Sequence, residues 1–261
     1  MVQTNLLYHI FLEFNLDNTI IYSYKHDIGR DKINVELYQG REISFITQST
    51  HEYLKKLKEN VLVVPTSTRT VEQYERIDLK AGSFKYALVC NGGILLENGV
   101  RADNWYRQSL REIEESNGEI EKGLKLLENN PLRTFEARYI EKLFVFTKCD
   151  SPELVVSQLE NELDGSYVDV FNNGSKVYIV PKSLNKGRAI ERFMEYMHES
   201  SAVAAGDSRF DIPMLKAADI GLAPAGFKEK FNIDFAVEEM EGKKVFSDEL
   251  LERCMKLCKS I

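Results

Sequence analysis

The sequence has little cysteine, and this excludes a disulfide-stabilised fold. Four cysteines in 261 residues, at positions 90, 149, 254 and 258, are too few and too scattered to form a disulfide framework. Cys254 and Cys258 lie four residues apart in a helical pattern, and we interpret them as packed side chains rather than as a metal or redox pair. This cysteine usage favours a reducing compartment, so we expect a cytoplasmic protein.

The chain also lacks an excess of positive charge and a long apolar run. Its 41 acidic and 34 basic side chains give a net charge of -7, which opposes binding to nucleic acid or to an anionic membrane surface. No apolar stretch approaches the roughly 18 residues that a membrane-spanning helix needs, and the first residues lack the basic segment of a secretory signal. We therefore predict no nucleic-acid partner, no membrane insertion and no export.

What the chain does contain is the composition of a globular protein. Hydrophobic residues make up 43% and charged residues 29%, which is enough apolar material for a buried core in one large domain or two modest ones. The oligomeric state stays open. Small ligands remain the class of partner that the charge does not oppose.

Short apolar segments alternate with helical patterns at the beginning of the chain and again after Lys186. Each apolar segment ends in a polar loop, as in a parallel sheet whose strands are joined by helices. The pattern predicts an α/β fold with one doubly wound, Rossmann-like parallel sheet. The predicted strands cover 7–14, 61–64, 85–90, 202–205 and 220–223, a hairpin covers 33–46, and helices cover 49–59, 71–77 and 186–197. We expect Ser49 and Glu52 to form a capping box for the first helix.

The middle of the chain has a different texture. Two charged helices are predicted at 105–116 and 119–128, followed by strands at 132–139 and 142–148, a helix that begins at Ser151 and Pro152, and a hairpin around 172–174. These antiparallel connections indicate a separate α+β module inserted into the first fold. We predict a catalytic core at 1–102 plus 184–261 and an inserted cap domain at 103–183.

Polar side chains follow the apolar strands or begin the helices of the predicted core. Because the carboxyl ends of parallel strands meet at one edge of a sheet, we expect these side chains to lie close together. Each has an ordinary structural explanation by itself, as a turn cap, a helix cap or a helix charge. Together, carboxylates, a hydroxyl and a lysine suit a hard cation and a phosphate group. The residues are Asn15, Asp17, Ser67, Thr68, Lys186, Asp207 and Asp211.

The order of these segments resembles the haloacid dehalogenase superfamily of phosphotransferases. Residues 15–19 read NLDNT where the family has Asp-x-Asp-x-Thr, and residues 67–69 read STR, with neighbouring Thr66 as an alternative to Ser67. Residues 185–190 read NKGRAI, and residues 206–211 read GDSRFD, which matches Gly-Asp-x-x-x-Asp. The inserted module is similar to the large cap of the sucrose-phosphatase-like and Cof-like branch, with residues 91–93, NGG, as the turn ahead of it.

The resemblance implies a Mg²⁺-dependent phosphatase that hydrolyses a small phosphate monoester through an aspartyl-phosphate, with a sugar phosphate as the leading substrate class. Position 15 would carry the nucleophile, and Asp17 would protonate the leaving group and then activate water. Ser67 would bind phosphate oxygens, and Lys186 would balance charge. Thr68, Arg69 and Asn185 would help to bind the substrate.

The resemblance also implies where the metal ion would sit. Mg²⁺ would be held by the side chain at position 15, by the backbone carbonyl of Asp17 and by Asp207, with Asp211 orienting these ligands. In the cap, Glu136, Arg138 and Lys182 are candidates for contacts to sugar hydroxyls, or are simply solvated surface residues. Glu13, inside the first strand, is interpreted as a packed side chain without a role in the reaction.

The sequence departs from the family at the nucleophile. Residue 15 is Asn, and a carboxamide is neutral and a poor nucleophile, so the ordinary acyl-phosphate cannot form. The change also removes one negative charge from the metal site, which weakens the expected binding of Mg²⁺. We therefore expect the chain as it stands to be an inactive form of a phosphatase. The alternative is a protein that binds a phosphorylated ligand without turnover.

Overall fold

The computed structural model of the chain describes residues 11–259 and divides into two compact units. The first unit, called here the core unit, comprises Met1–Val100 and Lys186–Ile261. The second, called here the cap unit, comprises Arg101–Asn185. Sequence analysis placed the domain boundaries after residue 102 and before residue 184. Each unit has its own sheet and its own apolar core, so each is described by itself.

The core unit contains an eight-stranded sheet in the order β15-β14-β13-β1-β5-β6-β7-β8. Neighbouring strands from β15 to β6 run parallel, and β7 returns antiparallel to β6. Strand β1 is buried throughout, as expected for a strand covered on both faces. Residues 7–10 of the predicted first strand lie outside the described residues. The strands are β1 (Phe11–Asn15), β5 (Leu62–Thr66), β6 (Tyr86–Val89), β7 (Ile94–Glu97), β8 (Val100–Arg101), β13 (Ala202–Ala205), β14 (Ile220–Ala223) and β15 (Glu238–Glu239).

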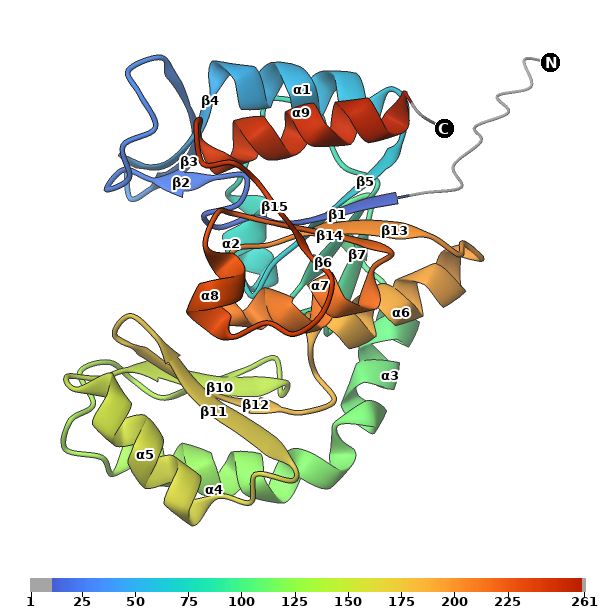
Figure 1. The fold of residues 1–261 in the computed structure, drawn as a ribbon. Helices are drawn as coiled ribbons and strands as arrows, with labels where there is room; N and C mark the ends of the chain where they lie inside the picture. The colour runs from blue at the N-terminus through green and yellow to red at the C-terminus, as the bar shows by residue number, and fades with distance from the viewer. Residues whose placement is uncertain (1–10, 260–261) are drawn as a thin grey trace. The chain divides into compact units, whose positions relative to one another are not determined.

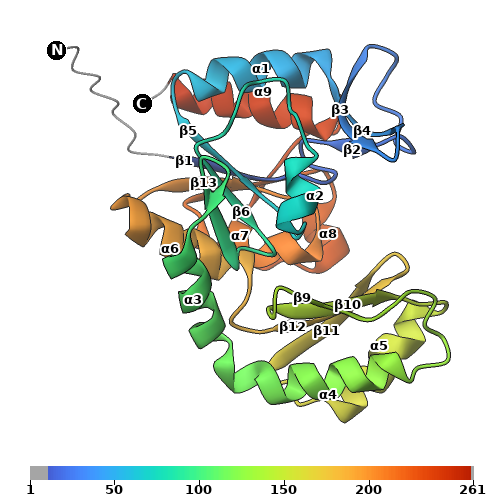
Figure 2. The ribbon, with the colours of Figure 1, turned by 180° about the vertical axis from the view of Figure 1, so that it is seen from behind.

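Helices cover both faces of this sheet. Figures 1 and 2 show α1 (Gln48–Lys58) and α9 (Phe246–Cys258) side by side on one face, and α6 (Lys186–Met197) and α7 (Ile212–Ala217) on the other. Two short helices, α2 (Val71–Glu75) and α8 (Phe227–Phe231), complete the unit. The predicted doubly wound α/β fold is therefore confirmed.

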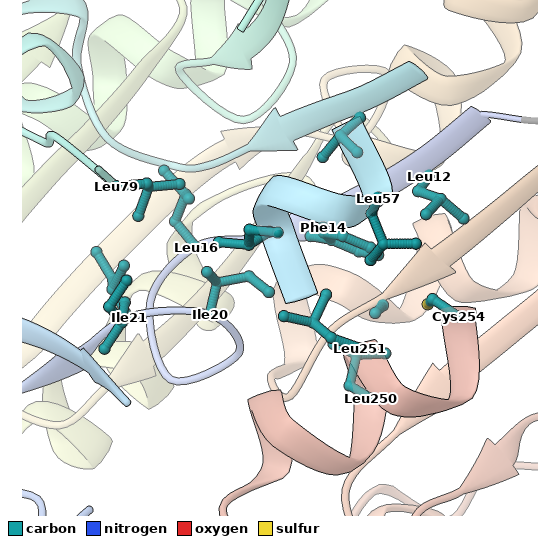
Figure 3. Packing of buried hydrophobic residues seen from close by; sticks show 14 of the residues in the cluster. Leu12, Phe14, Leu16, Ile20, Ile21, Leu57, Leu79, Leu250, Leu251 and Cys254 are labelled. Carbon is teal, nitrogen blue, oxygen red and sulfur yellow. The ribbon is translucent and has the colours of Figure 1, made fainter. Parts of the chain in front are cut away.

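Alternation along β1 decides which side chains face which helices. Leu12 and Phe14 belong to the apolar cluster that α1 and α9 complete (Figure 3). Phe11 points to the other face, where its ring lies 5.1 Å from the ring of Phe193 on α6. Because successive strand residues point to opposite faces, Glu13 and Asn15 share the face of Phe11. The alternation along β1 therefore directs the Asn15 side chain to the face of the sheet that α6 covers.

The core unit also carries a three-stranded antiparallel sheet in the order β2-β4-β3. It consists of β2 (Tyr22–Ser23), β3 (Lys32–Tyr38) and β4 (Arg41–Thr47), and β3 with β4 forms the predicted hairpin. Strand β4 leads directly into α1, so Thr47 keeps an extended backbone and its side chain accepts a hydrogen bond from Thr50 N at 2.9 Å. The predicted capping box of Ser49 and Glu52 is therefore wrong, because these residues lie inside the helix.

The cap unit contains a four-stranded antiparallel sheet in the order β11-β12-β10-β9. Side chains of α4 and α5 join those of the strands in one apolar cluster that includes the fully buried Ile120, Val155 and Ile179. The strands are β9 (Arg138–Ile140), β10 (Phe144–Lys148), β11 (Val168–Asn173) and β12 (Lys176–Pro181), and the helices are α3 (Asp103–Glu112), α4 (Asn117–Glu128) and α5 (Pro152–Glu162).

One predicted strand of the cap unit is mostly wrong. Residues 132–139 alternate as a strand does, yet only the last two of them belong to β9. Before that point the chain forms an isolated antiparallel bridge of Arg133 with Cys149, and further on the carbonyl of Phe135 accepts a hydrogen bond from the Thr147 hydroxyl. The backbone pairing thus breaks off between this bridge and β9, where the bond to the Phe135 carbonyl comes from a side chain. Across residues 11–259, no helix is both long and apolar enough to cross a membrane.

Candidate functional site

The predicted site residues of the core unit gather at the carboxyl ends of its parallel strands. Asn15 ends β1 and pairs in register with Thr66, the last residue of β5. Asp207 follows β13, and Lys186 is the first residue of α6. Hydrogen bonds connect Asn15, Lys186, Asp207 and Asp211 although they lie up to 196 positions apart in the chain. The expected edge of the sheet therefore brings these four side chains together.

Asn15 is the centre of this group, and its amide has a fixed direction. The oxygen Oδ1 accepts a hydrogen bond from Lys186 Nζ at 2.9 Å. The nitrogen Nδ2 donates to the Asp17 carbonyl oxygen at 2.9 Å and to Asp207 Oδ1 at 3.0 Å, with Asp211 Oδ2 further away at 3.3 Å. The side chain thus turns its oxygen to a cation and its NH₂ group to these acceptor oxygens and, at 3.5 Å, to the Thr19 hydroxyl oxygen.

Asp211 binds Lys186 and organises the loop after β13. Its Oδ1 forms an ion pair with Lys186 Nζ, and both side chains are almost completely buried. Its Oδ2 accepts hydrogen bonds from the backbone N–H groups of Asp207 and Ser208 and from the Ser208 hydroxyl. Gly206 permits this approach, because a Cβ atom there would lie 2.2 Å from Asp211 Cβ. The Gly-Asp pair of the motif is therefore a packing requirement as well as a chemical one.

Asp207 accepts hydrogen bonds from neutral donors. Its Oδ1 accepts from the Thr19 hydroxyl at 2.8 Å and from Asn15 Nδ2 at 3.0 Å. Burial, followed by the nearby charge of Asp211, raises the pKa of Asp207 to about 6. Its negative charge is thus less favourable here than in water.

Asp17 forms an ion pair with Arg69, which also contacts Glu36 of the β3–β4 hairpin. Arg69 donates from Nε and Nη2 to the two carboxylate oxygens of Asp17, at 2.8 and 2.7 Å, and from Nη1 to Glu36 Oε1 at 2.8 Å. Glu36 lies on β3 with a fully buried side chain, and it also accepts from Arg76 and from the Ser44 hydroxyl. Asp17 and Glu36 raise the pKa of Arg69 against the opposing effect of its own burial. Sequence reasoning missed Glu36, since nothing in an exposed-looking hairpin marks one acid as buried.

The strand end of β5 carries two hydroxyls with different surroundings. Thr66 donates to Glu13 Oε1 at 2.8 Å, whereas Ser67 Oγ accepts from the backbone N–H of Arg69 at 3.1 Å. The Thr66 hydroxyl is thus turned to the buried Glu13, which favours Ser67 over Thr66 as the motif residue. Thr68 lies half-buried in the same turn.

Glu13 is a fully buried acid two residues before Asn15. Burial raises its pKa from 4.5 to about 8, and the hydrogen bond from Thr66 and the charge of Lys186 offset only part of that effect. Its second oxygen, Oε2, is buried without a hydrogen-bond partner. The interpretation of Glu13 as a merely packed side chain therefore missed an unusual carboxyl group.

Tyr22 connects the loop after β1 to helix α9, and sequence reasoning missed it too. Its hydroxyl donates to the Thr19 carbonyl oxygen at 3.2 Å and accepts from the backbone N–H of Ser247 at 3.0 Å. Burial raises the pKa of Tyr22 to about 12, so the hydroxyl keeps its proton as the donor. The position of Thr19 beside Asp207 is thus tied to the start of α9.

The predicted substrate residue Asn185 belongs to the cap unit, where its amide donates to the Lys182 carbonyl oxygen. The three cap candidates form local, exposed ion pairs: Arg138 with Glu136, and Lys182 with Asp169 at 2.8 Å. These pairs give each of them a structural reason to be polar. Their contacts to a substrate remain predictions.

The side chains near Asn15 do not fit the implied divalent cation. Magnesium takes oxygen ligands, but Asn15 presents its NH₂ group to Asp207 and to the Asp17 carbonyl. Within residues 11–259 no group of three or more histidine, cysteine or acidic side chains is arranged to hold a metal ion. Magnesium thus stays a prediction for a carboxylate at position 15, and the amide of this chain does not suit it.

Comparison with known proteins decides the family. A sequence model of haloacid dehalogenase-like hydrolases matches residues 100–230, which is half of the chain. The chain belongs to this family. A phosphoglycolate phosphatase from Methanopyrus kandleri is 25% identical over 213 residues, which cover 77% of this chain and 87% of that protein.

Solved structures show the same fold. The sucrose-phosphatase of Synechocystis sp. PCC6803, solved with sucrose and phosphate, has a TM-score of 0.65 at 14% identity, covering 96% of this chain and 98% of that chain. A haloacid dehalogenase-like hydrolase from Bacillus subtilis has a TM-score of 0.57 at 14% identity, covering 96% and 92%. At these identities the likeness is one of fold.

Proposed function

We propose that the core unit carries the site of a phosphatase for small phosphate monoesters and that Asn15 stops hydrolysis in this chain. The observation that carries the proposal is the set of contacts around Asn15. Lys186 and the oxygens of Asp17, Asp207 and Asp211 surround it as a phosphoryl-transfer site requires, yet the group at the nucleophile position is an amide. The family, whose members are hydrolases, supports the same reaction class.

The chemistry needs a carboxylate at position 15. In an active form, an oxygen of that carboxylate would attack phosphorus, the bond from phosphorus to the ester oxygen would break, and the departing oxygen would take a proton from Asp17. Asp17 would then accept a proton from the water that hydrolyses the aspartyl-phosphate. An amide carries no negative charge and its oxygen is a weak nucleophile, so the first bond does not form.

Arg69 sets a further condition for this chemistry. Both oxygens of Asp17 accept hydrogen bonds from Arg69, so one of these bonds would open when Asp17 turns to the departing oxygen of the ester. A phosphate group that draws the guanidinium towards itself would open it, because Arg binds phosphate as readily as carboxylate. Binding of the ester and release of Asp17 would then be coupled.

The ligand class is a small phosphate monoester, with a sugar phosphate as the leading candidate. One relative is a phosphoglycolate phosphatase, and a sucrose-phosphatase of the same fold was solved with sucrose and phosphate, which are the two products that hydrolysis of a sugar phosphate gives. The fold likeness alone does not choose among sugars, nucleotides and phosphorylated acids.

The test is a comparison of this chain with the variant Asn15→Asp. Both proteins are assayed for phosphate release with Mg²⁺ against a panel of sugar phosphates, nucleotides and phosphorylated acids. We expect no release above background for the chain as it stands, and Mg²⁺-dependent release for Asn15→Asp. The double variant Asn15→Asp/Lys186→Met is the control, since it restores the carboxylate but removes the buried cation beside it.

Two outcomes contradict the proposal in different ways. Brisk turnover by the Asn15 protein shows that the nucleophile lies elsewhere. Binding of a phosphate ester by both proteins, with no turnover by Asn15→Asp, instead favours the alternative of a binding protein whose remaining groups are not arranged for the reaction. Isothermal titration with the esters of the panel separates these cases.

A further inference from the structure

A carboxylate and an amide at position 15 differ in the hydrogen-bonding groups that they offer to Lys186 on one side and to the oxygens of Asp17 and Asp207 on the other. A carboxylate has an oxygen on each side, so one oxygen can accept from Lys186 while the other shares a cation with the oxygens of Asp17 and Asp207. An amide has an oxygen on one side only. Since Lys186 Nζ lies 2.9 Å from Asn15 Oδ1, the nitrogen must face the other way.

The opposite orientation of the amide is unfavourable on both sides. A half-turn of the amide would place its NH₂ group against the ammonium group of Lys186, where donor faces donor. It would also place Oδ1 against the acceptor oxygens of Asp17, Asp207 and Asp211, which now lie 2.9 to 3.3 Å from the nitrogen. The buried ion pair of Lys186 with Asp211 keeps the ammonium group in place and so keeps the amide in its present orientation.

We propose that the Asn15 amide takes the place of a divalent cation, so that this acidic site assembles without a metal ion. The two amide hydrogens link the Asp17 carbonyl to the Asp207 carboxylate, which is the connection that a bound cation would make. The remaining acids have partners of their own: Asp17 has Arg69, and Asp211 has Lys186. This inference concerns metal binding and stability, and it does not depend on any phosphate ligand.

The experiment compares the thermal unfolding of the chain and of Asn15→Asp, each in EDTA and in a titration with MgCl₂. We expect the melting temperature of the Asn15 protein to stay the same throughout. Asn15→Asp should melt lower in EDTA, because the new carboxylate faces Asp207 and Asp211 with no cation between them. It should rise by about 5 to 10 °C when Mg²⁺ exceeds its Kd a hundredfold.

Two further variants make the test specific. Asn15→Ala removes the amide without adding charge, so the oxygens of Asp17 and Asp207 lose their donor, and we expect a smaller stabilisation by Mg²⁺ than in Asn15→Asp. This variant also keeps the test valid if Asn15→Asp does not fold in EDTA. Asn161→Asp, an exposed position on α5, makes the same chemical change away from the site and should not respond to Mg²⁺.

Each outcome bears on the proposal. Stabilisation of the Asn15 protein by Mg²⁺ to the same extent as Asn15→Asp overturns it, because the amide would then not exclude the cation. The proposal is also overturned if Mg²⁺ stabilises neither Asn15→Asp nor Asn15→Ala, since the amide would then not occupy a place where a cation binds. Isothermal titration with MgCl₂ alone gives the same comparison without unfolding. The melting experiment contains no phosphate ester, so a normal Mg²⁺ response of Asn15→Asp without phosphate release contradicts the phosphatase proposal and leaves this one standing.

Discussion

The two units of this chain bury different kinds of side chain. In the core unit, ionisable side chains are almost completely buried: Glu13, Glu36, Lys186, Arg192 and Asp211. In the cap unit, the buried polar side chains of the described residues are the hydroxyls of Ser109, Ser116 and Thr147. Buried charges cost free energy unless they are paired, whereas apolar packing stabilises a fold directly. The core unit therefore holds its functional groups at a cost in stability, and the cap unit folds around an ordinary apolar core.

The largest effect should come from the buried acid that lacks a full set of partners. Because the folded protein holds the Glu13 proton more tightly than the unfolded chain does, its contribution to stability is intact below about pH 4.5 and is lost as the pH rises to about 8. Glu13→Gln cannot ionise, so we expect the variant to match the parent at pH 4.5 and to exceed its unfolding free energy by about 5 kcal/mol above pH 8. Urea unfolding across this range measures the difference, and a constant gap at every pH contradicts the assignment.

Removal of the buried cation should have the next largest effect. Lys186→Met keeps the length of the side chain but leaves the Asp211 carboxylate buried without its ion-pair partner. We expect a loss of about 4 kcal/mol in the free energy of unfolding. The matched control lies in the cap unit: Lys182→Met breaks the exposed pair with Asp169, and its loss should stay below about 1 kcal/mol. Equal losses in the two variants would remove the contrast between the units.

Loss of the Glu36 charge on β3 should have a smaller effect on the free energy of unfolding. Glu36→Gln removes a buried charge that faces Arg69 and Arg76, and we expect a loss of about 2 kcal/mol in urea unfolding. Glu42→Gln, an exposed change on the partner strand β4, should stay within about 0.5 kcal/mol of the parent. A Glu36→Gln protein as stable as the parent would show that Arg69 does not need this contact.

The smallest effect tests the apolar packing of the cap unit. A methyl group at Gly123 on α4 would lie 2.5 Å from Ile179 Cδ1, so Gly123→Ala should cost about 1 kcal/mol after the gain in helix propensity is subtracted. Gly118 lies on the same helix with nothing within 4 Å of an added Cβ, and Gly118→Ala should stabilise the protein by up to about 1 kcal/mol. Thermal unfolding distinguishes the two signs, and stabilisation by both substitutions would show that the core of the cap unit is loosely packed.

The sequence by itself determined the parts that depend on local pattern. Apolar strands that end in polar loops indicated the parallel sheet, and its geometry then implied that Asn15, Lys186, Asp207 and Asp211 lie together, as their hydrogen bonds show. The hairpin of β3 and β4 followed from alternation and a turn. The capping box at Ser49 and the strand at 132–139 were predicted wrongly because more than one local structure fitted each sequence pattern. Contacts with neighbouring elements determined which structure formed.

Only the tertiary structure decided the surroundings of each site residue. In the sequence, Glu36 and Glu13 look like ordinary acids of strands. Glu36 is buried against Arg69, and Glu13 is buried because β1 lies in the centre of the sheet, and no local pattern contains either fact. Likewise, Asn15 in the sequence indicates only a missing nucleophile. The direction of its amide depends on Lys186 on one side and on the oxygens of Asp17 and Asp207 on the other. Hydrogen-bond direction is a property of the three-dimensional neighbours, because the same amide can present either a donor or an acceptor to a given side.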